Sequence, residues 1–217
     1  MIRIRLASDI VLLRFESQYQ LASPFLRIQE HYESSRFRKR VFTLEQYMDW
    51  YASEYGAFTY FEDWSGFNVP STAFDPFLAG EFDPLLVKEV RLLRALRRQR
   101  RPFYVIGIYS DEDLRHEIAH ALFFTRPAYR NAVLTAMRRY DTSALARRLM
   151  KAGYHREVVP DETHAYLVAP SGELRGTRAL APLQKELRAL FRRHAAELSL
   201  PKRARRQSRG RAKRPAR

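Results

Sequence analysis

The stretch of sequence that decides the fold is Asp111-Glu112-Asp113-Leu114-Arg115-His116-Glu117-Ile118-Ala119-His120-Ala121-Leu122. Within it, His116, Glu117 and His120 fit the pattern H-E-x-x-H. On an α-helix, residues four apart lie one turn apart on the same face, so the imidazoles of His116 and His120 can converge on one metal ion. Glu117 lies beside them, where its carboxylate can polarise a metal-bound water molecule instead of binding the metal itself.

The residues around this motif predict a helix that follows a strand. Ser110, with Asp113 three residues later, is expected to cap the helix, and acidic residues in its first turn complement the helix dipole. An apolar stripe runs beside the histidine face and contains Leu114, Ile118, Ala121 and Leu122. Residues 103–109 are predicted to form the preceding strand. A strand that leads into a helix with two histidines is the arrangement that a zinc hydrolase needs.

The motif also has an ordinary explanation. A pattern with three fixed positions arises by chance in roughly one chain in a hundred of this size. Two histidines on a helix can also be polar surface groups without a ligand. The preceding strand and the small side chains of Ala119 and Ala121 favour the metal site.

Composition narrows the class of protein. With 217 residues, 46% of them hydrophobic and 13% aromatic, the chain can bury a substantial core. The absence of cysteine excludes disulfides, cysteine-ligated zinc and thiol nucleophiles. The N-terminal residues lack the apolar core of a signal peptide, and no run approaches the length of a transmembrane helix. We therefore expect a cytoplasmic protein without a membrane partner.

The net charge of +15 is concentrated at the C-terminus. Residues 201–217 hold nine Lys or Arg and no acid, which leaves 30 basic against 24 acidic residues in the rest of the chain. Such a segment cannot bury enough apolar surface to fold alone, so we expect a basic disordered tail. It either aids solubility or binds a polyanion such as nucleic acid through its phosphates.

The remaining elements are predicted from hydrophobic periodicity and capping residues. Strands are expected at residues 2–6 and 9–15. Helices are expected over residues 18–34 (helical after Pro24), 44–56 (with a Thr43/Gln46 capping box), 84–99, 127–140, from Asp141 or Thr142 to 153, from 160 to about 168, and 177–198. The aromatic stretch at residues 58–70 is expected to be a loop that packs on the core, or alternatively lines a substrate cleft.

A catalytic zinc keeps three protein ligands, so a third ligand is required. The candidates after His120 are Asp141, His155, Glu157, Asp161, Glu162, His164 and Glu173. Glu162 is our choice, because it opens a predicted helix and because the small Ala165 permits close approach to the first helix. Alternatively, Glu162 is an acidic residue that only complements the dipole at the start of its helix, and His155 or His164 is the third ligand.

With these residues the sequence resembles the zincin metallopeptidases of the gluzincin type, in which a second helix donates a glutamate after the H-E-x-x-H helix. His116, Glu117 and His120 match the first motif fully, and Glu162 matches the second in residue type and in its position on a helix. The extended metzincin motif is absent, because Phe123 and Arg126 occupy the positions of its glycine and third histidine. The resemblance covers residues 103–168.

The resemblance implies an α+β fold, a mainly helical zincin-like domain over residues 1–200 with a small sheet beside the motif helix. It also implies zinc held by His116, His120 and Glu162, with Glu117 as general base for hydrolysis of a peptide or protein substrate. Tyr166 and His164 are catalytic candidates for stabilising the oxyanion, with Tyr154 and His155 as alternatives. The competing interpretation is a binding adaptor with a basic tail and a structural or inactive metal site.

Overall fold

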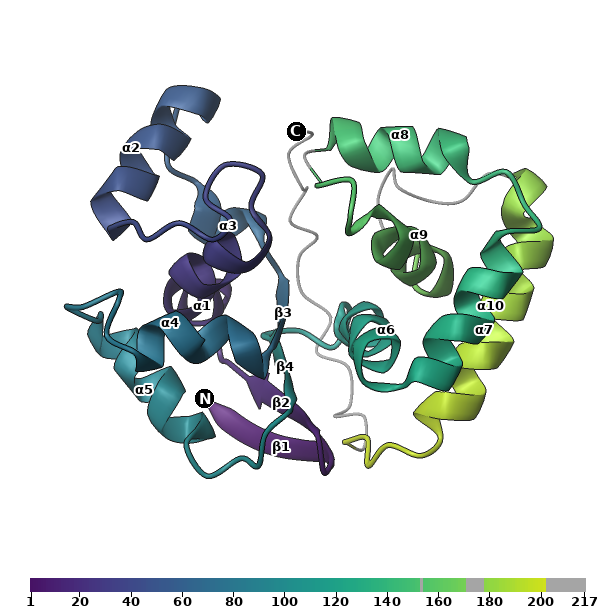
Figure 1. Ribbon diagram of the computed structural model, residues 1–217, viewed down its shortest axis with the longest axis horizontal. Helices are drawn as coiled ribbons and strands as arrows, with labels where there is room; N and C mark the ends of the chain where they lie inside the picture. Colours follow the sequence, from purple (N-terminus) through teal and green to yellow (C-terminus); the bar gives the residue numbers. More distant parts are fainter. Residues whose placement is uncertain (153, 171–177, 202–217) are drawn as a thin grey trace.

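A mixed sheet of four strands lies at the centre of the described chain (Figure 1). The computed structural model describes residues 1–152, 154–170 and 178–201. The strand order is β1 (Ile2–Ala7), β2 (Ile10–Arg14), β4 (Tyr104–Ile108) and β3 (Gly66–Pro70). β2 and β4 are parallel, whereas β1 and β3 pair antiparallel to their neighbours at the two edges.

Both faces of the sheet are covered by helices, so its central strands are apolar on both sides. On one face Leu12 and Ile106 join a cluster built mainly from the C-terminal helices. On the other face Val11 and Val105 join a cluster built mainly from the N-terminal helices. The predicted α+β class with mainly helical content is confirmed.

The N-terminal layer is rich in aromatic residues, many of them in mutual ring contact. Its elements are α1 (Gln18–Glu33), α2 (Leu44–Tyr55), α3 (Tyr60–Asp63), the 3-10 helix η1 (Ser71–Phe74), α4 (Asp75–Leu78) and α5 (Val87–Leu96). The predicted Thr43/Gln46 capping box is present, and α2 ends at Gly56 in the left-handed conformation.

The C-terminal layer is more aliphatic and carries the H-E-x-x-H motif. Its elements are α6 (Leu114–Thr125), α7 (Pro127–Met137), α8 (Ser143–Lys151), α9 (Val159–Val168), the 3-10 helix η2 (Arg178–Leu180) and α10 (Ala181–Ala195). None of the helices in the described ranges has the length and apolar character required to cross a membrane.

Three expected boundaries were wrong. α1 begins at Gln18, six residues before Pro24, because Ser17 caps it and burial along the helix offsets the backbone bond that proline cannot make. α5 begins at Val87 and not at Pro84. α6 begins at Leu114, and Ser110 accepts a bond from the Glu112 amide in the preceding turn instead of capping the helix.

The aromatic stretch at residues 58–70 is not a plain loop, since it contains α3 and the edge strand β3. An edge position explains why Gly66 and Pro70 are tolerated at the two ends of this strand. Three expectations fall outside the described residues, namely the end of α8 at Gly153, the start of the last helix at Thr177 and the tail from residue 202 onward.

Candidate metal centre

Two packed helices bring three ligand atoms together. α6 carries His116 and His120 one turn apart, and α9 carries Glu162 near its start. The Nε2 atoms of the two histidines are 3.0 Å apart. The Glu162 carboxylate lies 3.7 Å from Nε2 of His116 and 3.6 Å from Nε2 of His120. The predicted third ligand is therefore beside the other two.

This cluster fits a small cation. Tetrahedral zinc with bonds of about 2.1 Å would hold its ligand atoms about 3.4 Å apart, close to the three observed separations. In the described part of the chain, Oε2 of Glu162 is buried and accepts no hydrogen bond. A buried carboxylate oxygen without a donor is costly, and a cation between the three groups would satisfy it.

Asp161 orients the second histidine. Its Oδ2 lies 2.9 Å from Nδ1 of His120, which leaves Nε2 facing the cluster. Burial opposes a charge on His120, but the carboxylates of Asp161 and Glu162 outweigh it and raise the pKa of His120 well above its usual range. Burial likewise opposes ionisation of Asp161, yet the charge and hydrogen bond of His120 lower the pKa of Asp161 to about 2.

His164 does not face the ligand cluster, in contrast to its expected role at the oxyanion. The side chain is fully buried, with Nε2 2.7 Å from the Tyr129 hydroxyl and Nδ1 3.4 Å from Oδ1 of Asp161. Both ring nitrogens therefore have partners inside the protein. His164 lies behind Asp161 and contacts its carboxylate, so it helps to hold the group that orients His120.

The predicted general base, Glu117, is held by the edge strand of the sheet. The side-chain amide of Asn68 donates a hydrogen bond of 2.8 Å to Oε2 of Glu117, and the Tyr104 hydroxyl donates one of 2.5 Å to Oδ1 of Asn68. Burial raises the pKa of Glu117, while the nearby imidazoles and the Asn68 amide act in the opposite direction. A buried carboxyl with a raised pKa is suited to taking up a proton.

Gly66 leaves the space that this carboxylate occupies. A Cβ atom at residue 66 would lie 2.2 Å from Oε1 of Glu117, well inside van der Waals contact. Gly66 and Asn68 are two residues apart on β3, so both lie on the face of the sheet that α6 covers. The sequence prediction missed both residues. An asparagine between Phe67 and Val69 in a strand-like alternation is the signal that could have revealed them.

The tyrosine candidates lie beside the first histidine. The Tyr166 ring packs edge-on against the His116 ring at 4.7 Å, and its hydroxyl is 3.0 Å from that of Tyr154. Burial and the Glu162 carboxylate raise the pKa of Tyr154, which keeps its hydroxyl protonated as a donor.

The other candidates do not join the cluster. Asp141 accepts a hydrogen bond from the Ser143 amide at the start of α8, and Glu173 lies outside the described residues. Glu157 is exposed and pairs with Arg38, 2.6 Å away, so it does not join the cluster. His155 lies 3.9 Å from Glu157 and lines a neighbouring pocket.

Comparison of the chain with protein-family models, with curated proteins and with solved structures finds no match. The function is therefore inferred from the site alone.

Proposed function

We propose that the protein is a metal-dependent hydrolase that binds zinc and cleaves peptide bonds. The observation that carries this proposal is the convergence of His116, His120 and Glu162 within 4.8 Å of one another, with Glu117 on the same helix. These four residues are the same ones in which the sequence resembles the gluzincins. The proposed ligands are two neutral imidazoles and one carboxylate, a combination typical of catalytic zinc.

Zinc would supply a Lewis acid that polarises the scissile carbonyl and increases the acidity of water. Glu117 is the group on this chain that accepts the proton of the attacking water and delivers it to the leaving amine. The Asn68 amide fixes the direction of that carboxylate, and its contact with Tyr104 fixes Asn68 in turn. The hydroxyls of Tyr154 and Tyr166 are the nearby donors for the negative charge that develops on the carbonyl oxygen.

The proposal is tested by measuring zinc content and peptidase activity on the same preparations. Wild-type protein should carry about one zinc per chain, as expected for a site with three ligands. Glu117→Gln should retain zinc and fold while hydrolysis falls by about 10²- to 10⁴-fold, because only the proton acceptor is lost. His116→Ala should lose zinc and activity together.

Two results would overturn the proposal. The first is a folded wild-type protein that stays free of zinc after incubation with zinc and desalting. The second is a Glu117→Gln variant as active as the wild type. Glu112→Gln, at an exposed carboxylate before the same helix, is the matched control and should change neither property.

A further inference from the structure

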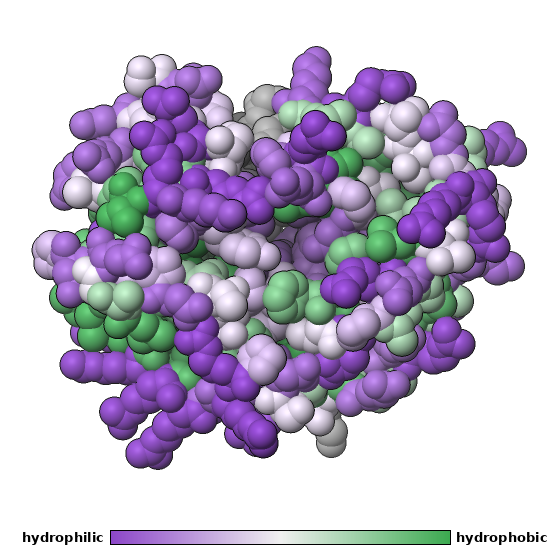
Figure 2. Space-filling view, viewed as in Figure 1, coloured by the Kyte–Doolittle hydropathy of each residue, from purple (hydrophilic) through white to green (hydrophobic). Residues whose placement is uncertain are grey.

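A surface rich in arginine lies where the end of α5 meets the edge strand β1. Residues 90–110 contain six arginines and no acidic residue, and residues 1–8 contain two arginines and again no acid. Hydrophilic side chains project from this end of the molecule, over α5 at the lower left of Figure 2. The arginine surface consists of six exposed side chains, those of Arg3, Arg5, Arg94, Arg97, Arg98 and Arg100.

A buried glutamine joins the two parts of this arginine surface. The side chain of Gln99 accepts a hydrogen bond of 2.6 Å from the guanidinium group of Arg3 and donates one of 2.6 Å to the carbonyl oxygen of Ser8. Gln99 is only 8% exposed, so these two contacts hold the turn after α5 against β1. Arg5 lies between the two contacts along the chain, and the residues on either side of Gln99 are arginines.

The charge of this surface is not balanced by acids. Its six guanidinium groups form no ion pair with any residue in the described ranges, and the acids that flank the two segments have other partners. Glu89 pairs with the buried Arg27, and Asp9 pairs with Arg126. Like charges held together raise the free energy of the folded protein, and a polyanion at this surface would lower it.

The helix dipole accounts for only part of this cluster. A cation in the last turn complements the partial negative charge at a helix end, which explains Arg94. The effect falls off within that turn, whereas two of the other arginines lie beyond Arg97, the C-cap residue of α5. Two more lie on β1, and a strand in a sheet has only a small net dipole.

The described chain ends beside the same strand. The backbone N–H of Ser199 donates a hydrogen bond of 2.8 Å to the carbonyl oxygen of Leu6 on β1, and the yellow end of the described chain reaches this strand in Figure 1. The residues that follow in the sequence, 202–217, include nine Lys or Arg and no acid. One extended polyanion that passes this end of the molecule would therefore meet both groups of cations.

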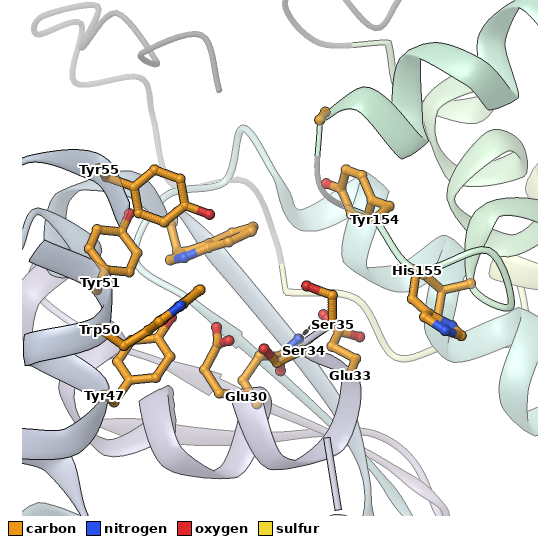
Figure 3. Close-up of a pocket in the computed structure, with 14 residues that line it drawn as sticks. Glu30, Glu33, Ser34, Ser35, Tyr47, Trp50, Tyr51, Tyr55, Tyr154 and His155 are labelled. Atoms are coloured by element: carbon orange, nitrogen blue, oxygen red, sulfur yellow. Dashed lines mark hydrogen bonds between the residues drawn. The ribbon is translucent and has the colours of Figure 1, made fainter. Parts of the chain in front are cut away.

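Acidic side chains gather at a different place. Glu30 and Glu33, at the end of α1, line a pocket together with Trp50 of α2 and His155 of the segment before α9 (Figure 3). Within the described part of the chain, no Lys or Arg lines that pocket. Separation of the two signs of charge leaves a positive field at the arginine surface, and such a field steers anions toward it.

We propose that the arginine surface binds nucleic acid through its phosphates. All six cations are arginines, whose planar guanidinium groups offer two parallel N–H donors to phosphate oxygens and are favoured in nucleic-acid recognition. Contacts to phosphates fix the position of the nucleic acid but do not read its bases, so binding should not depend on sequence. Phosphate binding requires neither zinc nor hydrolysis, so it does not depend on the proposed function.

The binding experiment uses the full chain and two short fluorescein-labelled DNA duplexes of equal length and unrelated sequence. Fluorescence anisotropy, measured over a series of salt concentrations, should give equal affinity for the two duplexes. Affinity should fall steeply with salt, because log K falls by about 0.9 per unit of log salt concentration for each phosphate contacted. Absence of binding at low salt, or a strong preference for one duplex, would overturn the proposal.

A triple variant assigns the contact to the body of the protein. Arg97→Gln/Arg98→Gln/Arg100→Gln keeps the length and polarity of this turn but removes three charges. We expect the salt slope, the slope of log K against log salt concentration, to become shallower by about 3 and the affinity at low salt to fall at least about tenfold. Arg5→Gln on β1 should make the slope shallower by about 1. Thermal unfolding and zinc content, which should not change, report on the fold.

A matched triple variant removes the same charge elsewhere. Arg36→Gln/Arg40→Gln/Arg138→Gln replaces exposed arginines that follow the ends of α1 and α7, as the tested arginines follow α5. It should leave the salt slope close to that of the wild type. If the two triple variants bind DNA equally well, the net charge or residues 202–217 account for binding, and the arginine surface does not.

Anionic vesicles separate nucleic acid from the other common carrier of phosphate groups, the membrane surface. Vesicles of phosphatidylserine and phosphatidylcholine are added to the complex of protein and DNA at a matched concentration of phosphate. The wild-type protein should stay bound to DNA. Displacement of the DNA by vesicles, together with loss of vesicle binding in the Arg97→Gln/Arg98→Gln/Arg100→Gln variant, would show that the surface faces a membrane and would overturn the assignment.

Discussion

The cluster of His116, His120 and Glu162 and the neighbouring surface around Glu33 both contain carboxylates, but these have different partners. In the cluster, Asp161 pairs with His120, and Glu162 faces both His116 and His120. Glu33 accepts a hydrogen bond from the neutral amide of Gln29 and forms no ion pair with any of the described residues. The cluster comes from two helices close in sequence, whereas Glu33, at the end of α1, lines a pocket together with residues of α2 and of the segment before α9. Charged groups that face one another inside the protein set each other's pKa values, whereas the pKa of a carboxyl group beside a neutral amide is set mainly by its burial.

The largest effect is expected from removing the third ligand. Glu162→Ala should weaken zinc binding by more than about 100-fold, because disturbing even the outer shell of a metal site costs about 10- to 100-fold. Glu157→Ala is the matched control, since Glu157 is exposed and pairs with Arg38 away from the cluster. Zinc titration with a competing chelator measures both. A stronger loss of zinc affinity in Glu157→Ala would mean that the third ligand lies in the segment between α8 and α9 and not on α9.

The second-largest effect is expected from a change in the strand that lies beside Glu117, the proposed general base. Gly66→Ala places a methyl group where Oε1 of Glu117 lies, so the flexible carboxylate must move. We expect kcat to fall about 100-fold, within the range of general-base catalysis, with zinc content unchanged. Gly56→Ala is the control, because residue 56 has a positive φ and no neighbour near its Cβ position, so the change should lower stability without affecting kcat. Loss of zinc in Gly66→Ala would show that the strand supports the ligands as well.

A smaller loss should follow when the partner of His120 is weakened. Asp161→Asn keeps the shape of the side chain but removes the charge that faces Nδ1 of His120. Zinc affinity should fall about 10- to 100-fold, and the variant should remain folded. Unchanged affinity would mean that the position of His120 depends on packing alone.

The smallest effect is expected at Glu33, whose described partner is the neutral amide of Gln29. The pKa of Glu33 is raised to about 8 in the folded protein, against about 4.3 in an unfolded chain. The folded state therefore binds the extra proton between these values, and stability falls as pH rises through this window. Metal-free Glu33→Gln should be more stable than metal-free wild type at pH 8 by on the order of 1 kcal/mol, since partial exposure screens the charge.

Chemical denaturation at pH 5 and pH 8 measures this difference. Glu54→Gln, the exposed control on α2, should match the wild type at both pH values. A Glu33→Gln variant whose stability follows that of the wild type across the whole range would mean that Glu33 already has a charged partner in solution.

Local patterns predicted which three side chains lie together, and long-range packing determined what the sequence left open. The spacing of His116 and His120, and the position of Glu162 on the next acidic helix start, were readable because each depends on a few neighbouring residues. The contacts of Asn68 with Glu117 and Tyr104 join segments separated by 49 and 36 positions, so they depend on the pairing of β3 with β4. His164 was misjudged for the same reason, because its burial against Tyr129 follows from the packing of α7 beside α9.

The pairing of β3 with β4 also restricts insertions and deletions in the segment that leads to the residues beside Glu117. Side chains alternate between the two faces of a strand, so a slip of one residue would exchange the faces completely. Phe67 or Val69 would then point at Glu117, and both the amide donor and the open space at Gly66 would be lost together. The connection between α3 and β3, residues 64 and 65, should therefore tolerate changes of residue type far better than a single insertion or deletion.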